Sequence, residues 1–282
     1  MVANNEIRCK TPPGIGHNHV WTIGVTSDTG VVWEKQAPMS TSYIAPSVSE
    51  VLGASSLPTR GGATVTLAGT NFSPYLCGEG SSCSDHQRKI SDSAIIKYGR
   101  SLSQIEEFDC VNPRAAADTG ADGLMHLLCE TTPGVGAVLW WGISIGMKSS
   151  NLQNALWSQE SNRFEGADTA YAVPSISSVE SETLSTAGQE VITVRRTNFG
   201  LDPYPVEMMY GKYAASSCRV ELGDADDSII CSSVEGIGFD HRAKVVVGGQ
   251  TSPLSPEGEV VNYLPPRIMI QQRATDGPSL EA

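Results

Sequence analysis

One motif recurs three times along the chain, and it constrains the fold more than any other sequence feature. The copies lie at residues 7–16, 127–136 and 229–238. Each begins with an apolar residue, has a cysteine two positions later, and ends in Gly-x-Gly. Each copy precedes a strand-like run, at 21–25, 141–145 and 243–247, and then a tyrosine shortly before a proline: Tyr43, Tyr171 and Tyr263. Such self-similarity indicates a chain built from repeated structural units.

A second set of matches occurs twice and gives the order of elements within one unit. Residues 46–51 match 174–179, residues 64–72 match 191–199 with a shared Thr-Asn-Phe ending, and Tyr98-Gly99 matches Tyr210-Gly211. We therefore expect the back part of one repeat in residues 1–43, complete repeats in 44–171 and 172–264, and the start of a further repeat in 265–282. This organisation predicts that the chain is an excerpt from a longer array.

Short alternating segments with frequent turn residues predict an all-β fold. In residues 64–68 the apolar side chains Val65 and Leu67 alternate with threonines and would face one side of a strand. The 28 glycines and 16 prolines interrupt such segments at short intervals. Repeats of roughly 90–130 residues with many short strands are typical of β-sandwiches.

The order of these motifs resembles the IPT/TIG domain. The resemblance rests on Pro-x-Ile/Val at the start, Thr-Asn-Phe, Tyr-Gly, and the cysteine motif with its glycines, and it covers nearly the whole chain. It implies tandem immunoglobulin-like (E-set) β-sandwiches, as in plexins, fibrocystin-type surface proteins and large surface proteins of protists and bacteria. In that family the module serves mostly as a spacer and a binding unit.

The repeat register assigns five of the seven cysteines. It pairs Cys110 with Cys129 and Cys218 with Cys231, and it makes Cys9 equivalent to Cys129 and Cys231. The partner of Cys9 would then lie upstream of the chain, so that Cys9 is left unpaired by truncation. Disulfides imply an oxidising compartment and hence an extracellular or cell-surface location. Buried free thiols in a cytosolic protein are the alternative.

The other two cysteines, Cys77 and Cys83, lie only six residues apart within residues 44–171. We expect them to close a small disulfide loop that the other repeats lack. A zinc site formed by Cys77, Cys83 and His86 is the alternative, although the chain has no second Cys/His pair at the usual spacing.

Two patterns resemble catalytic or metal-binding motifs but fit the repeats better. Residues 142–146 spell G-x-S-x-G, which in hydrolases requires a strand-to-helix turn, whereas the repeat register places Ser144 on the outward face of a strand. The acidic turns at 118–122 and 224–228 leave weak calcium binding open, but Ile229 replaces the glycine of a calcium loop. We therefore predict no enzymatic activity and no cofactor.

Three residues are candidates for modification or ligand contact at the surface. Asn71 begins the one Asn-x-Ser/Thr sequon of the sequence and is a possible glycosylation site, or a structural residue of its turn. Trp140 should face away from Trp141, and Trp157 lies in an insertion found only in residues 44–171. Trp140 and Trp157 together would form a ligand patch.

Charge and hydropathy narrow the possible partners. The 19 Lys+Arg against 31 Asp+Glu give a net charge of −12 without any basic run, which disfavours nucleic-acid binding. No apolar stretch is long enough for a membrane span, so we expect no direct membrane insertion. The expected partners are neighbouring repeats and an unidentified protein or carbohydrate ligand.

These features together predict a non-catalytic extracellular repeat array, which serves as spacer, adhesion or ligand-binding region of a larger cell-surface or secreted protein. The alternative is a set of accessory modules beside a receptor or secreted-enzyme domain that lies outside this chain.

Overall fold

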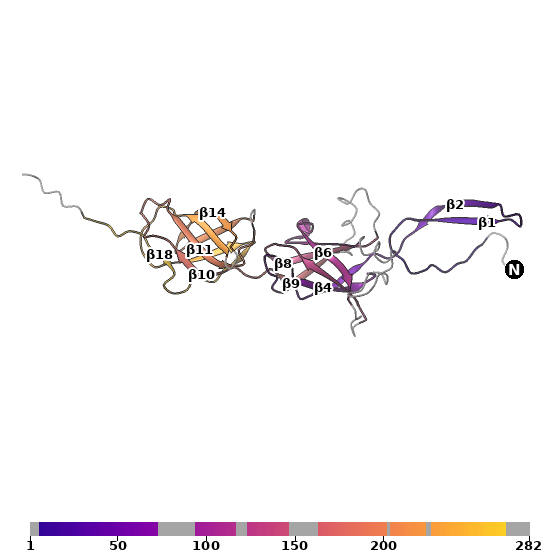
Figure 1. Ribbon diagram of the computed structural model, residues 1–282, viewed down its shortest axis with the longest axis horizontal. Helices are drawn as coiled ribbons and strands as arrows, with labels where there is room; N and C mark the ends of the chain where they lie inside the picture. Colours follow the sequence, from indigo (N-terminus) through magenta and orange to yellow (C-terminus); the bar gives the residue numbers. More distant parts are fainter. Residues whose placement is uncertain are drawn as a thin grey trace, which may run out of the picture.

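The structure is a computed structural model that describes residues 6–72, 94–116, 123–146, 163–201, 204–223 and 227–268. Figure 1 shows three bodies in a row: an N-terminal hairpin, a middle sandwich formed by strands β3 to β9, and a C-terminal sandwich formed by β10 to β18. The one helical element described is a single 3-10 turn, η1 (Leu102–Gln104). The predicted all-β class, with immunoglobulin-like sandwich modules, is confirmed.

The N-terminal hairpin consists of two antiparallel strands, β1 (His19–Thr26) and β2 (Val32–Thr41). Within the part of the chain that the structure describes, neither strand pairs with a third. Side chains on both faces of the hairpin are exposed.

The middle sandwich is one antiparallel sheet of seven strands folded round a core, in the order β3-β4-β7-β6-β5-β8-β9. Strand β6 pairs with β7 and with β5, and the ladder with β7 is interrupted by a bulge between Val111 and Arg114. The first and last strands, β3 and β9, lie against each other, so the sheet nearly closes. The strands are β3 (Ser47–Leu52), β4 (Thr64–Thr70), β5 (Ile95–Gly99), β6 (Phe108–Ala115), β7 (Met125–Thr131), β8 (Ala137–Ser144) and β9 (Arg163–Ala170).

The C-terminal sandwich has two separate sheets, in the orders β10-β11-β15-β14 and β13-β12-β16-β17, with β18 also pairing with β16. These orders correspond to A-B-E-D and C′-C-F-G of an immunoglobulin domain. The strands are β10 (Ser175–Glu180), β11 (Val191–Thr197), β12 (Val206–Tyr210), β13 (Tyr213–Ala214), β14 (Ser216–Glu221), β15 (Asp227–Ser232), β16 (His241–Val247), β17 (Gln250–Thr251) and β18 (Val260–Val261).

Alternation of apolar and polar residues places the cores. On β4, Val65 and Leu67 are fully buried, whereas Thr64 is exposed and Thr66 is half-buried, as a strand with one buried face requires. Ile192 and Val194 on β11 are likewise fully buried, in the core of the C-terminal sandwich. Each sandwich therefore has a core of its own.

No helix in the described part of the chain is long and apolar enough to cross a membrane.

Candidate functional site

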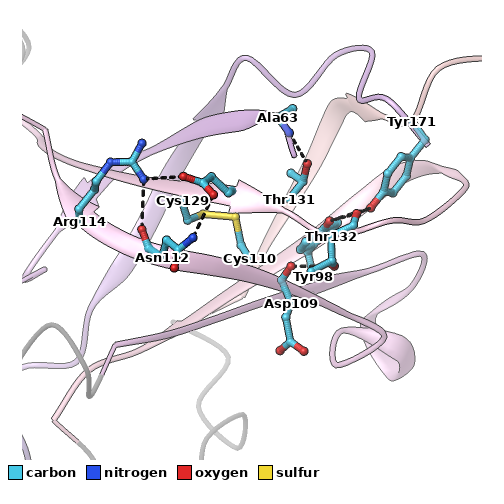
Figure 2. The surroundings of a disulfide bond; sticks show 11 residues. Ala63, Tyr98, Asp109, Cys110, Asn112, Arg114, Cys129, Thr131, Thr132 and Tyr171 are labelled. Atoms are coloured by element: carbon cyan, nitrogen blue, oxygen red, sulfur yellow. Dashed lines mark hydrogen bonds and ion pairs between the residues drawn. A yellow bond between two sulfur atoms is a disulfide. The ribbon is translucent and has the colours of Figure 1, made fainter. Parts of the chain in front are cut away.

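A buried disulfide joins two neighbouring strands of the middle sandwich (Figure 2). Cys110 on β6 is bonded to Cys129 on β7, with the Cα atoms 5.5 Å apart. Beside the bond, Asn112 Nδ2 donates to Glu130 Oε2 at 2.9 Å, and Arg114 Nη1 pairs with Glu130 Oε1 at 3.3 Å. The disulfide and these polar contacts together tie the bulged part of β6 to β7.

The remaining cysteines fall into three groups. Cys218 on β14 is bonded to Cys231 on β15, again between neighbours in one sheet. Cys9 is a free and exposed thiol. Cys77 and Cys83, with the alternative zinc site that contains them, lie outside the described residues. The structure thus contains both disulfides that the repeat register predicts.

A pair of tyrosines closes the core of the middle sandwich. The Tyr98 ring stacks on the Trp141 ring at 4.4 Å between centroids, and the Tyr98 and Tyr171 hydroxyls lie 2.7 Å apart. Tyr171 donates its hydroxyl to the Thr132 carbonyl at 2.8 Å, and a Cβ at Gly134 would lie 2.5 Å from the Tyr171 oxygen. Burial raises the pKa of both tyrosine hydroxyls above the ordinary value.

The C-terminal sandwich repeats this arrangement. The Tyr210 and Tyr263 hydroxyls lie 2.8 Å apart, and Tyr263 donates to the Val234 carbonyl at 2.7 Å. Burial, followed by the bond to Tyr210, raises the pKa of the Tyr263 hydroxyl. Gly236 is the equivalent of Gly134. It leaves room for the Tyr263 ring, because a Cβ at Gly236 would lie 2.4 Å from that ring.

The junction between the middle and C-terminal sandwiches is closely packed. Val135, from the loop before β8, is buried, and its side chain occupies the space that a Cβ at Gly200 or at Gly248 would fill. Gln250 Nε2 donates to the Tyr171 carbonyl at 2.9 Å. This leaves the short connection between the two sandwiches little freedom to bend.

An aromatic contact adds to the same junction. The Tyr204 ring of the C-terminal sandwich lies 6.1 Å from the Phe108 ring and 5.9 Å from the Arg100 guanidinium of the middle sandwich. Glu107 holds Arg100 in place, with Arg100 Nη2 and Glu107 Oε1 2.7 Å apart. Burial, and then the Glu107 carboxylate, raise the pKa of the Tyr204 hydroxyl.

An ion pair also crosses this junction. Arg60 Nη2 lies 2.5 Å from Asp227 Oδ1 and donates to the Gly223 carbonyl as well. Only 4% of the Asp227 side chain is exposed, so its charge depends on Arg60 for compensation. Asp227 belongs to one of the acidic turns considered above for calcium, and in the structure its carboxylate serves this inter-module contact.

The junction between the N-terminal hairpin and the middle sandwich is packed in the same way, with an apolar side chain against a glycine. A Cβ at Gly146 would lie 2.8 Å from the Ile15 side chain, as a Cβ at Gly248 would lie 2.8 Å from Val135. Ile15 and Val135 occupy the same position of the repeated motif, as do Gly146 and Gly248. A cavity of about 310 Å³, lined in part by Ile15 and Asn71, lies beside this first junction.

The candidate surface residues are placed as follows. Trp140 lies on the face of β8 opposite Trp141 and packs half-buried against Ile105. Trp157 lies outside the described residues, so the structure does not bring the two tryptophans of the candidate patch together. Ser144 is in strand β8 as expected, but it is buried rather than on an outward face, because the second face of β8 is covered too.

Asn71 forms a turn contact that recurs. Its backbone φ is 60°, and its side-chain amide donates to the Ala45 carbonyl at 3.2 Å. Asn198, which is not part of a sequon, has φ of 68° and donates to the Val173 carbonyl at the same distance. This turn accounts for the asparagine in both repeats, and glycosylation of the exposed Asn71 stays a prediction.

Metal-ligating side chains do not gather in the described ranges: no three His, Cys, Asp or Glu residues there come close enough to hold an ion. Residues 118–122 and 224–226, which contribute to the acidic turns considered for calcium, lie outside those ranges.

No protein-family model matches this sequence, and no curated protein matches it. Among solved structures, the chain is similar to the Plexin A4 extracellular region, with 14% identity, a TM-score of 0.27, and coverage of 79% of this chain and 18% of that one. It is also similar to a surface glycan-binding protein from Prevotella bryantii, with 13% identity, a TM-score of 0.32, and coverage of 76% and 42%.

The chain therefore spans about a fifth of the plexin chain and less than half of the glycan-binding protein. The assignment of the immunoglobulin-like fold rests on the strand order and the two cores described above.

Proposed function

We propose that this chain is an extracellular, non-enzymatic array of immunoglobulin-like modules of the IPT/TIG type. Its function is to hold parts of a larger cell-surface or secreted protein at a set spacing and angle. The observation that carries this proposal is the repeated junction, in which Val135 packs on Gly248 and Ile15 packs on Gly146.

Three independent contacts support a stiff connection between the two sandwiches. They are the packing of Val135, the aromatic contact of Tyr204, and the ion pair between Arg60 and Asp227. Domains of one chain generally move relative to each other unless their interface is hydrophobic, and the buried Val135 and the ring contact between Tyr204 and Phe108 give this junction an apolar part. The two disulfides support an oxidising location, because such bonds are rare in the cytosol.

Small-angle X-ray scattering tests the spacer function. A stiff array gives one elongated particle whose maximum dimension matches the row of modules in Figure 1. A variant with a flexible Gly-Ser insertion after Ala172, between the sandwiches, serves as the flexible reference. The proposal fails if the unaltered chain scatters like this reference.

Mass spectrometry of the non-reduced protein tests the location. We expect Cys110, Cys129, Cys218 and Cys231 to be bonded when the protein is secreted by its own cells. Free thiols at these four positions would contradict an extracellular location.

Ligand binding is the second part of the proposal, and Trp140 and Trp157 are the residues through which a protein or carbohydrate would be held. Double substitution by alanine should remove cell or glycan binding while leaving the scattering profile unchanged. Retained binding would exclude this patch.

A further inference from the structure

The two disulfides are embedded differently in their sheets. Cys110 lies in an inner strand, β6, and has a ladder partner on each edge, Ile96 on β5 and Thr131 on β7. Cys218 lies on β14, which is the last strand of its sheet within the part of the chain that the structure describes. The ladder that β14 forms with β15 is interrupted at Cys218. Backbone pairing therefore holds Cys110 from two sides and Cys218 from neither.

The interruption in β14 is a bulge with an unfavourable backbone. The register shifts between Ser216 and Arg219, so Ser217 and Cys218 have no ladder partner on β15. Ser217 has φ of 52°, in the left-handed region that residues with a Cβ rarely adopt. Beyond the bulge, the pairing with β15 is limited to residues 219–221. A short edge segment with few backbone bonds opens locally at low cost, so the disulfide supplies much of the attachment of β14.

The two disulfides also differ in their access from solvent. Cys110 and Cys129 are 3% and 0% exposed and belong to the core of the middle sandwich. Cys231 is 1% exposed, but its partner Cys218 is half-buried at the edge of the C-terminal sandwich. A thiolate that reduces a disulfide must reach one of its sulfur atoms. It can approach the second bond from the Cys218 side, whereas the core encloses the first bond.

Arg60 of the middle sandwich holds acceptors from both β14 and β15. Asp227, whose carboxylate pairs with Arg60 Nη2, is the first residue of β15. Strand β15 is paired with β11 on its other edge, and this keeps Asp227 in place. Gly223, whose carbonyl accepts from the same nitrogen, follows shortly after the end of β14. Its position depends on β14, so a loosened β14 takes away one of the two acceptors of Arg60.

We propose that the bond between Cys218 and Cys231 is a redox switch for the junction between the two sandwiches. With the bond intact, β14 holds Gly223 against Arg60 and the junction is stiff. A dithiol reductant opens this bond and leaves the buried bond of the middle sandwich closed. Strand β14 then loosens, Gly223 leaves Arg60, and the sandwiches move more freely. The inference rests on the stiff junction of the proposed function and adds a means of regulating it.

The exchange is balanced by the dithiol alone. One thiolate of the dithiol attacks the Cys218 sulfur, which breaks the S–S bond, forms a mixed disulfide and releases Cys231 as a thiolate. The second thiolate of the reductant then attacks the mixed disulfide and releases Cys218. The cysteine pair takes up the electrons that the dithiol loses and, through solvent, an equal number of protons, while the dithiol becomes a disulfide.

Selective reduction is the first test, on the whole chain with the free thiol of Cys9 alkylated beforehand. The native protein is treated with dithiothreitol, new thiols are trapped with an alkylating reagent of different mass, and the labelled peptides are identified by mass spectrometry. We expect Cys218 and Cys231 to be trapped at least about tenfold faster than Cys110 and Cys129. Equal rates, or faster trapping in the middle sandwich, would overturn the proposal.

The second test compares the oxidised chain with the chain reduced at Cys218 and Cys231 alone. Reduction should make amide hydrogen exchange in β14 at least about tenfold faster, with β7 as an unchanged internal reference. X-ray scattering should show a broader distribution of distances between the sandwiches. Cys218→Ala combined with Cys231→Ala should give the same two results. The selectively reduced chain decides the question without this variant, should the variant not fold.

Arg60→Gln is the matched variant for the route through Arg60. It lacks the guanidinium to which Gly223 and Asp227 are bonded. Reduction should therefore still speed up exchange in β14 of this variant but should not broaden its scattering further. Further broadening as large as in the unaltered chain would overturn the coupling of the disulfide to the junction.

The two proposals fail in different measurements. An oxidised chain that scatters like the flexible reference contradicts the spacer function. A chain that scatters as one stiff particle, both oxidised and reduced at Cys218 and Cys231, leaves the spacer function intact and overturns the redox switch.

Discussion

Replacing Gly248 by alanine tests whether the junction fixes the two sandwiches relative to each other. Gly248 and Gly249 form the tight turn between β16 and β17, and both have positive φ, 55° and 81°. A Cβ at Gly248 would lie 2.8 Å from Val135 Cβ of the neighbouring module, whereas a Cβ at Gly249 would meet nothing within 4 Å. Gly249→Ala is therefore a matched control with the same backbone problem and no contact across the junction.

The expected difference follows from these two geometries. Alanine in a left-handed conformation costs about 1–2 kcal/mol at either position. At Gly248 alone, the methyl group also overpacks the junction, which costs typically about 1–3 kcal/mol more in a close-packed site. The sandwiches can relieve this overlap by moving apart, which weakens the bond from Gln250 to the Tyr171 carbonyl.

Urea unfolding and X-ray scattering measure the two consequences. Gly248→Ala should lower the free energy of unfolding by about 1–3 kcal/mol more than Gly249→Ala. It should also broaden the distribution of distances between the sandwiches, which the control leaves unchanged. Equal stability and equal scattering of the two variants would refute the close packing of Val135 on Gly248.

Three further changes probe the cores and the ion pair. Replacing both Cys110 and Cys129 by alanine should cost about 3 kcal/mol in urea unfolding, because the bond closes a loop with a sequence separation of 19. Burial raises the pKa of the Tyr171 hydroxyl above its ordinary value of 10. Above pH 10, the folded state therefore keeps the hydroxyl proton that the unfolded state loses. Stability is then complete below pH 10 and falls above it by up to about 1.4 kcal/mol per pH unit, a slope that Tyr171→Phe should reduce in urea titrations. Arg60→Gln should cost about 1–2 kcal/mol, between exposed and buried ion pairs, and adding Asp227→Asn should restore most of it in a double-mutant cycle.

The elements that could be predicted from sequence are those that occur more than once. The recurring Thr-Asn-Phe marked a turn, and Asn71 and Asn198 have the same conformation and the same side-chain contact. The recurring cysteines gave the pairs found in the structure, although Cys110 precedes the bulge of its strand and Cys218 lies within one. A bulge depends on local backbone geometry and leaves no repeated letter, so the register alone does not place it.

The tyrosine pairs show how far recurrence extends. Both members recur, Tyr98 with Tyr210 and Tyr171 with Tyr263, and this was the available signal for a shared role. Their hydroxyl contact could not be read from the sequence, because the two tyrosines of a pair are 73 or 53 positions apart and meet through the packing of different strands.

The contacts across the junction had no such signal. No sequence motif pairs Arg60 with Asp227 or Arg100 with Tyr204. In both pairs, one residue belongs to the middle sandwich and the other to the C-terminal sandwich. Sequence reasoning within one repeat cannot find such partners, since the geometry that joins them exists only between repeats.

The glycines of the repeated motif combine both kinds of information. Gly134 leaves space for the Tyr171 ring inside its own module, so it serves the core. Gly136 has φ of 116°, and a Cβ there would lie 2.6 Å from the Arg100 side chain of its own module, which itself lies 5.9 Å from the Tyr204 ring of the next module. One glycine is required by the core of the module and the other by a side chain that the module places at the junction. The motif that recurs in this sequence therefore contributes to the array as well as to the module.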